Sequence, residues 1–155
     1  MRRNRLAFGL PALAAAVLAL SGMAPSERGF AEDRAMGHGR FITGGSAVTR
    51  FVFNVRVKSG GTVDGRARFF DNGSLALDLE VTCMTFVNST TVIIGGTDQA
   101  NPSVTYAFRA IDNGSSGSPA DQITLPQSGQ TCSTFSTLGN WSVIGSGDDV
   151  EVRDV

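Results

Sequence analysis

The polar loop at residues 110–121 holds the side chains of this sequence that are best suited to bind an ion. Asp112, Asn113 and Asp121 supply three side-chain oxygens, and the glycines between them allow the backbone to wrap closely. Ca²⁺ in proteins is bound by about six to eight oxygen atoms, so the loop predicts a calcium site. The alternative is that these side chains cap the backbone amides of their own loop, as Asp and Asn commonly do in turns. The spacing differs from that of an EF-hand, and the sequence favours the alternative.

Residues for acid–base or nucleophilic catalysis are scarce. His38 is the single histidine, and no Gly-x-Ser-x-Gly motif stands between a predicted strand and a predicted helix. Asp78 and Glu80 share one face of a predicted strand, whereas the carboxylates of a glycosidase face each other across a cleft, so a solvated stripe is favoured. One histidine and two cysteines are too few for the usual zinc sites. We therefore predict no catalytic residues and favour a protein that is not an enzyme.

The N-terminal segment has the order typical of an export signal. Arginines at positions 2, 3 and 5 precede an uncharged apolar stretch at 6–20, and small residues follow. Cleavage after Ala24 and cleavage after Ala31 both remain open. A transmembrane span needs about 20 apolar residues, and this stretch is shorter and is interrupted by Pro11. We predict a secreted bacterial protein in which residues 1–31 are a signal peptide and a short polar tail reaches residue 36.

The composition describes one domain with a slight acidic excess. The 155 residues include 13 Lys and Arg, 14 Asp and Glu and 19 Gly, and 41% are hydrophobic. Such values are typical of a turn-rich protein with a core rather than of a disordered chain. Removal of residues 1–31 leaves 9 basic and 13 acidic residues, a net charge of −4. Because this charge does not attract phosphate, we predict no nucleic-acid partner, and we expect no membrane span after signal cleavage.

From residue 37 onward apolar and polar residues alternate, which is typical of half-buried β-strands. Three neighbouring strands are predicted at 51–58, 62–70 and 74–83. The last two are joined by Asp71-Asn72-Gly73, and the Asn-Gly pair tolerates the positive φ values of a tight hairpin turn. The side chains predicted to face the interior are Phe51, Phe53, Val55, Val57, Val63, Ala67, Phe69, Leu75, Leu77, Leu79, Val81 and Cys83.

About eight strands are expected in all, and no segment has a convincing helical face. The others lie at 39–43, 90–95, 104–109 and 123–125, and the segments 141–144 and 150–152 are expected to form a closing hairpin or a single bent strand. Many short strands at close spacing are typical of β-sandwiches and small barrels. We therefore predict an all-β fold, an antiparallel β-sandwich or a small closed β-barrel, with residues 37–155 as a single β domain.

The two cysteines are predicted to form a disulfide bond. Small secreted domains fold in an oxidising compartment, where paired cysteines are more common than free thiols. Cys83 and Cys132 are 49 positions apart, and closing a loop of this length stabilises a fold by about 4 kcal/mol in the chain-entropy model. The alternative is two unpaired buried thiols, which mass spectrometry without reductant would detect.

Several of these features together resemble one family of secreted bacterial β domains. The pattern consists of Gly37-x-Gly39-x-Phe41, Phe51-x-Phe53-Asn54-Val55, Gly65 before a strand that ends in Asp71, Val81-Thr82-Cys83, Gly95-Gly96, Asp112-Asn113-Gly114 and Asp121. It resembles the post-COAP-1 domains over roughly residues 37–155. The resemblance implies a small extracellular β domain, alone or behind surface-anchored modules, and no established activity. Members often carry a glutamate where this chain has Ser115, so the resemblance implies one carboxylate fewer for calcium here.

These observations favour a secreted non-catalytic module, structural or binding, at a bacterial cell surface or in the medium, with an unknown protein or cell-wall partner. The alternative is a barrel with an interior pocket that carries a small ligand or catalyses a reaction. Inward side chains such as Phe51, Phe53, Leu77 and Leu79 are large enough to fill a small barrel, which favours the first hypothesis.

Overall fold

The structure, a computed structural model, describes residues 32–155 with the exception of 44–46, 115–119, 136–140 and 145–147. Within these residues all regular secondary structure is β-strand, and no helix is present that is long and apolar enough to cross a membrane. The strands of this described part are β1 (Arg34–Thr43), β2 (Ala47–Val57), β3 (Val63–Asp71), β4 (Ser74–Asn88), β5 (Thr91–Asp98), β6 (Thr105–Ile111), β7 (Gln122–Thr124), β8 (Gln127–Ser128), β9 (Trp141–Val143) and β10 (Asp149–Arg153).

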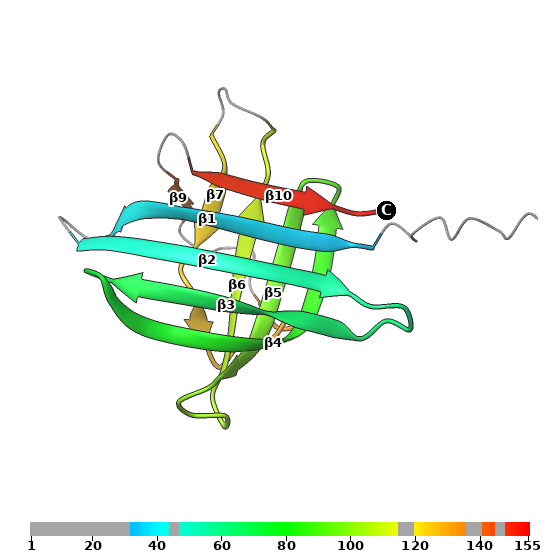
Figure 1. The fold of residues 1–155 in the computed structure, drawn as a ribbon, viewed down its shortest axis with the longest axis horizontal. Coiled ribbons are helices and arrows are strands. Elements are labelled where there is room, and N and C mark those ends of the chain that lie inside the picture. The colour runs from blue at the N-terminus through cyan, green and yellow to red at the C-terminus, as the bar shows by residue number, and fades with distance from the viewer. Residues whose placement is uncertain (1–31, 44–46, 115–119, 136–140, 145–147) are drawn as a thin grey trace, which may run out of the picture. The chain divides into compact units, whose positions relative to one another are not determined.

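The strands form one antiparallel sheet that curls into a nearly closed barrel (Figure 1). Their order is β10-β1-β2-β3-β4-β5-β6-β7-β9, and β8 pairs with β6. Eight of the described strands, from β10 through β7, make the wall of the barrel. The predicted all-β antiparallel fold is confirmed, and of the two predicted architectures the structure has the barrel.

The long strand β4 connects two layers of the barrel. It pairs with β3 through residues 74–80 and with β5 through residues 79–88. The pairing shifts between Val81 and Cys83, and a β-bulge of this kind bends a strand and increases its twist. In Figure 1, β1, β2, β3 and the first part of β4 lie side by side in front, while β5 and β6 run across behind them. The bend in β4 therefore carries the chain from one layer into the other.

The hairpin turn predicted between β3 and β4 is confirmed. Asp71 pairs with Ser74, so Asn72 and Gly73 form a two-residue loop. Both have a positive φ, 47° for Asn72 and 86° for Gly73. This is the backbone of a type I′ turn, which matches the twist of the two strands and which few residues other than Asn and Gly adopt without strain.

Apolar side chains fill the interior of the barrel. Phe108 of β6 is fully buried, and its ring meets those of Phe53 and Phe69 edge to face, with centroids 5.5 and 5.1 Å apart. Such edge-to-face pairs are a favourable geometry for aromatic rings. The other buried residues of this core are Ala35, Phe41, Phe51, Val55, Ala67, Leu77, Leu79, Val81, Val92, Ile94, Ala110, Ile123, Ile144, Val150 and Val152. All eight wall strands therefore contribute to one core.

A second, smaller apolar cluster lies on the outer side of β5 and β6. The disulfide bond between Cys83 and Cys132 joins β4 to the segment after β8, with Cα atoms 6.1 Å apart. Gly95 lies beneath this bond, and an added Cβ would come within 2.7 Å of the Sγ atom of Cys83, so the absence of a side chain makes room for the disulfide. The predicted pairing of the cysteines is confirmed. The other buried members of the cluster are Ile93, Ala107 and Phe135.

Three details differ from the sequence predictions. β1 begins at Arg34, within the segment expected to be a tail up to residue 36, because Ala35 is buried between two neighbouring strands. Leu75 and Cys83 were predicted to face inward, but Leu75 is 55% exposed and Cys83 packs in the outer cluster, since the pairing of β4 shifts near both residues. The segments 141–144 and 150–152 do not pair with each other, because β9 pairs with β7 and β10 with β1.

Candidate functional site

The barrel closes between β10 and the loop that follows β6, and two carboxylates make this closure. The backbone N–H of Val150 donates to Oδ2 of Asp121 at 2.8 Å, and the N–H of Val152 donates to Oδ2 of Asp112 at 3.0 Å. In the described sheet β10 has only β1 as a strand partner, so these amides lie on its unpaired side. A hydrogen bond from a backbone N–H to a carboxylate is roughly twice as strong as one between two neutral groups. We call these four residues the barrel seam.

The remaining oxygens of the same two carboxylates cap the loop itself. Oδ1 of Asp112 accepts the N–H of Gly114, and Oδ1 of Asp121 accepts the N–H of Asn113, both at 2.8 Å. The side chain of Asn113 donates from Nδ2 to the carbonyl of Ala120. The structure therefore brings together the three residues predicted to bind calcium and uses them in the way that the capping alternative describes.

A calcium ion at Asp112, Asn113 and Asp121 stays a prediction. Each of the four carboxylate oxygens accepts a backbone amide, so an ion at this place would have to share them. Among the residues that the structure describes, no group of three or more His, Cys, Asp or Glu side chains is placed to hold a metal ion. Calorimetry at millimolar calcium, together with melting in chelator, tests the prediction.

Replacing Asp121 by Asn is expected to lower the free energy of unfolding by about 1–3 kcal/mol. The side chain is 6% exposed, and the amide nitrogen of Asn cannot accept the N–H that one carboxylate oxygen of Asp121 now holds. A buried donor is then left without a partner. Urea unfolding of the variant measures the change, with the exposed Asp154→Asn as the control. Equal stability of the two variants would show that the seam does not depend on this carboxylate.

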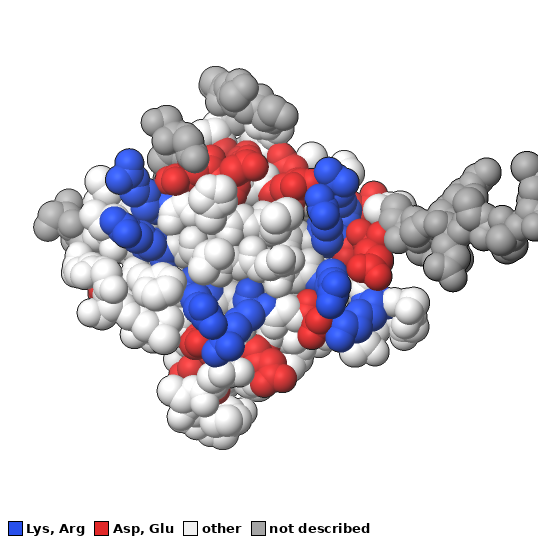
Figure 2. All heavy atoms as spheres, in the orientation of Figure 1, with Lys and Arg blue, Asp and Glu red and all other residues white. Residues whose placement is uncertain are grey.

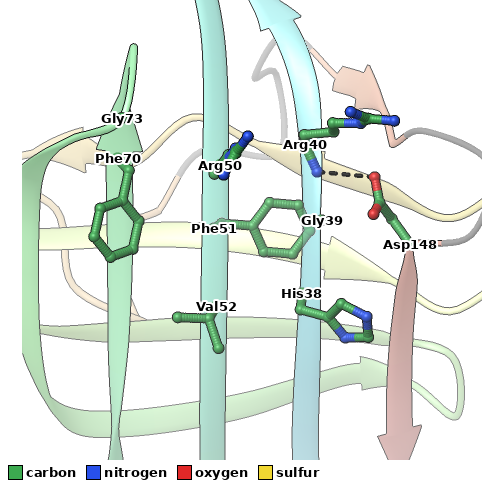
Figure 3. A pocket seen from close by; sticks show the side chains of 9 residues that line it. All are labelled: His38, Gly39, Arg40, Arg50, Phe51, Val52, Phe70, Gly73 and Asp148. Atoms are coloured by element: carbon green, nitrogen blue, oxygen red, sulfur yellow. Dashed lines mark hydrogen bonds between the residues drawn. The ribbon is translucent and has the colours of Figure 1, made fainter.

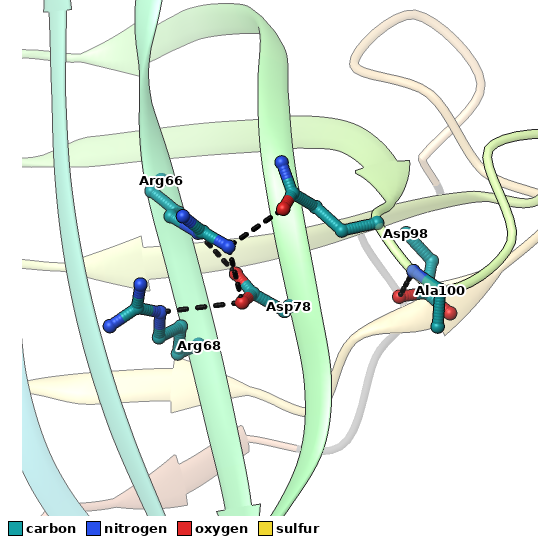
Figure 4. Close-up of polar contacts among 6 residues, drawn as sticks. Arg66, Arg68, Asp78, Asp98 and Ala100 are labelled. Atoms are coloured by element: carbon teal, nitrogen blue, oxygen red, sulfur yellow. Dashed lines mark hydrogen bonds and ion pairs between the residues drawn. The ribbon is translucent and has the colours of Figure 1, made fainter.

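Two arginines hold Asp78, one of the two carboxylates considered for catalysis (Figure 4). Arg66 donates to its two oxygens at 2.5 and 2.6 Å, and Nε of Arg68 lies 3.4 Å from Oδ2. Arg66 also donates to Oε1 of Gln99 at 2.7 Å. The hydrogen bonds from Arg66 hold the pKa of Asp78 below its ordinary value, against the opposing effect of burial. A carboxyl group of such low pKa stays ionised at neutral pH and is poorly suited to act as a general acid.

Replacing Asp78 by Asn is expected to destabilise the fold by about 1 kcal/mol at neutral pH, the upper range for a pair near the surface. Because the folded-state pKa of Asp78 is lowered, its contribution is present above the unfolded-state pKa of about 3.9 and is lost as the pH falls through the folded-state value. The difference in melting temperature between variant and wild type should therefore vanish in strong acid. A difference that persists there would assign the effect to packing rather than to charge.

An open groove of about 520 Å³ lies on the outer face of β1, β2 and β3 (Figure 3). Strand register places Arg40, Arg50 and Phe70 in one row across the three strands, and His38 and Val52 in the next row. Alternate residues of a strand face the same side, so both rows face outward. The other lining residues are Gly39, Phe51, Gly73 and Asp148. We call this site the outer groove.

Arg40 and Arg50 lie directly opposite each other in the β1–β2 pair, and both are exposed. No described carboxylate forms an ion pair with either guanidinium group. The neighbouring basic residues, by contrast, each have a carboxylate partner. The basic residues with a carboxylate partner are Arg34 and Arg153 with Glu151, Arg56 and Lys58 with Asp64, and Arg66 and Arg68 with Asp78. Figure 2 shows this face, with basic side chains in groups and acidic side chains beside several of them.

His38 and Asp148 complete the polar lining of the outer groove. Oδ2 of Asp148 accepts the backbone N–H of Arg40 at 3.0 Å, so this carboxylate is attached to the edge of β1. His38 is exposed, and among the described lining residues no serine, threonine or cysteine lies beside it. The described lining therefore offers a ligand positive charge and apolar contact.

The outer groove was not predicted from the sequence. A signal was available, because Arg40 and Phe70 alternate with the buried Phe41 and Phe69, and Arg50 directly precedes the predicted strand at 51–58. The alternation within one strand cannot show that Arg40, Arg50 and Phe70 form a row, since this depends on the register between strands.

Comparisons of the chain with protein-family models, with curated proteins and with solved structures found no match. The fold and the site therefore define a class by geometry alone, a disulfide-linked antiparallel β-barrel with a filled interior and an open groove on its outer face. The resemblance to the post-COAP-1 domains stays a prediction.

Proposed function

We propose that this chain is a secreted, non-catalytic binding module that acts at a bacterial cell surface or in the medium. Export is supported by the basic, apolar and small-residue order of the N-terminal segment. The disulfide bond between Cys83 and Cys132 agrees with folding in an oxidising compartment.

The observation that carries the proposal is the filled interior of the barrel. A carrier of small molecules needs an enclosed space of about 300–1,000 Å³ inside its wall. Here that space is taken by large side chains, with Phe108 between Phe53 and Phe69 and with Leu79 and Ile94 fully buried. The outer groove, by contrast, is open to solvent. Binding at the outer surface is therefore the function that this geometry supports best.

The experiment is expression in a bacterial host with the native N-terminus, followed by fractionation and N-terminal sequencing. We expect the protein outside the cytoplasm, cleaved after Ala24 or Ala31. The exported protein should sediment with purified cell-envelope material and should stay in solution without it. A cytoplasmic, uncleaved and unbound protein would contradict the proposal.

The same preparation separates this function from the interior-pocket alternative. Native mass spectrometry of the exported protein should show the mass of the polypeptide alone. A small molecule that copurifies and leaves only on unfolding would mean that the barrel encloses a ligand, and the filled interior would then be wrong.

A further inference from the structure

We propose that the outer groove binds a carboxylate-bearing saccharide, with the guanidinium groups of Arg40 and Arg50 holding the carboxylate. The inference rests on the proposed function, because it names a ligand class for the same secreted module. The groove volume of about 520 Å³ is that of a small-molecule site. Because the groove is open on its outer side, a sugar unit can enter it as part of a longer chain.

The charge of the outer groove favours an anionic ligand. Arg40 and Arg50 are directly opposite in the β1–β2 pair, and like charges at such positions destabilise a sheet. Elsewhere on this face each described basic group forms an ion pair with a carboxylate, as Arg56 does with Asp64. The described lining residues carry two guanidinium charges and one carboxylate, that of Asp148, whose Oδ2 is hydrogen-bonded to backbone. An anion in contact with both guanidinium groups would relieve their repulsion, which favours an anionic ligand at this pair.

The shape of a guanidinium group favours a carboxylate as the anion. A guanidinium group is planar and presents its donors as a fork, which fits the two oxygens of a carboxylate. Phe70 lies beside Arg50 in the same row, and Val52 lies in the next row. They offer an apolar surface next to the charge. A sugar ring that carries a carboxylate, as in a uronic acid, combines the anion with a C–H face that packs against such a surface.

The strand pairing around the outer groove favours a saccharide over an acidic peptide. An extended peptide is commonly bound by adding a strand to the edge of a sheet. β2 and β3 have a strand on both sides, and β1 pairs with β10 through Arg34–His38. Beyond this pairing the backbone N–H of Arg40 is already bound by Asp148. The outward face of these strands therefore offers side chains rather than free backbone groups, which suits a sugar carboxylate with a ring better than a peptide backbone.

The test is calorimetry of the exported protein with an oligogalacturonate and with its uncharged counterpart. We expect binding of the oligogalacturonate alone, and affinity about tenfold weaker in each of Arg40→Gln and Arg50→Gln. The matched control is Arg56→Gln, which removes the same charge from the same strand about 20 Å away and should change the affinity by less than about twofold. At one ligand concentration the oligogalacturonate should raise the melting temperature of the wild type and of this control by more than that of the two groove variants.

Several results would overturn the inference. They are equal binding of the uncharged sugar, equal or tighter binding of polyphosphate or of an acidic peptide, and a loss in Arg56→Gln as large as in Arg40→Gln. Sedimentation with envelope material tests the proposed function separately. If the exported groove variants sediment with envelope material as the wild type does, the module function stands and the saccharide site fails. If the wild type is neither exported nor bound, the module function fails.

Discussion

Replacing Phe108 by Ala is expected to lower the free energy of unfolding by about 3–5 kcal/mol, the usual effect of deleting a buried phenyl ring. The ring is fully buried and meets Phe53 and Phe69, which belong to the opposite layer of the barrel. Its removal therefore leaves a cavity between the layers that the backbone of a closed barrel can only partly fill. Since small domains are stable by about 5–15 kcal/mol, the loss is a large share. Urea unfolding followed by circular dichroism measures it.

Phe70→Ala is the matched control, because it deletes the same ring from the outer groove. That side chain is half-buried, so we expect a change of about 1 kcal/mol or less. A similar loss in the two variants would mean that Phe108 is not at the centre of the core. Phe70→Ala should in addition weaken oligogalacturonate binding, whereas partly folded Phe108→Ala gives no interpretable affinity.

Removing the disulfide bond through Cys83→Ser together with Cys132→Ser is expected to destabilise the fold by about 4 kcal/mol. In the chain-entropy model this is the effect of releasing a loop closed over a sequence separation of 49. The segment around Cys132 and Phe135 would also lose its attachment to β5, where they pack against Ile93. Melting of the double variant against the oxidised wild type measures the change.

Reductant supplies the control for this second experiment. Reduced wild type should melt close to the double variant, and the double variant should not respond to reductant at all. A wild type whose melting is insensitive to reductant, with both thiols shown to be free, would contradict the stabilising role of the bond.

Most of the fold follows from local patterns in the sequence. The alternation at Phe51, Phe53 and Val55 placed β2 and its buried face correctly, and the Asn72-Gly73 pair located the β3–β4 turn because few other residues accept two positive φ values. Along β4 the predicted alternation failed at Leu75 and at Cys83, where the pairing with the neighbouring strand shifts. A bulge has no simple local signature, since it depends on the strand opposite.

The candidate site was harder to predict from the sequence because it depends on the register between neighbouring strands. Arg40 and Arg50 are ten positions apart, and only the β1–β2 pairing puts them face to face. The barrel seam was equally hard to predict, because it also joins segments that are distant in the sequence. Asp112 and Asp121 were recognised as amide caps of their own loop, but their bonds to Val152 and Val150 join segments separated by 40 and 29 positions. Composition and periodicity describe neighbours along the chain, whereas both features are contacts between distant segments.

The barrel seam also affects whether copies of this protein can associate through their strands. An edge strand with free backbone amides is a template to which a strand of another molecule can add, and this is a common first step of aggregation. In β10 the amides of Val150 and Val152 are already occupied by Asp121 and Asp112. The same carboxylates present negative charge to the carbonyl oxygens of any approaching strand. Two aspartates thus protect this side of β10 from intermolecular pairing, a task for which other proteins use an additional strand or helix.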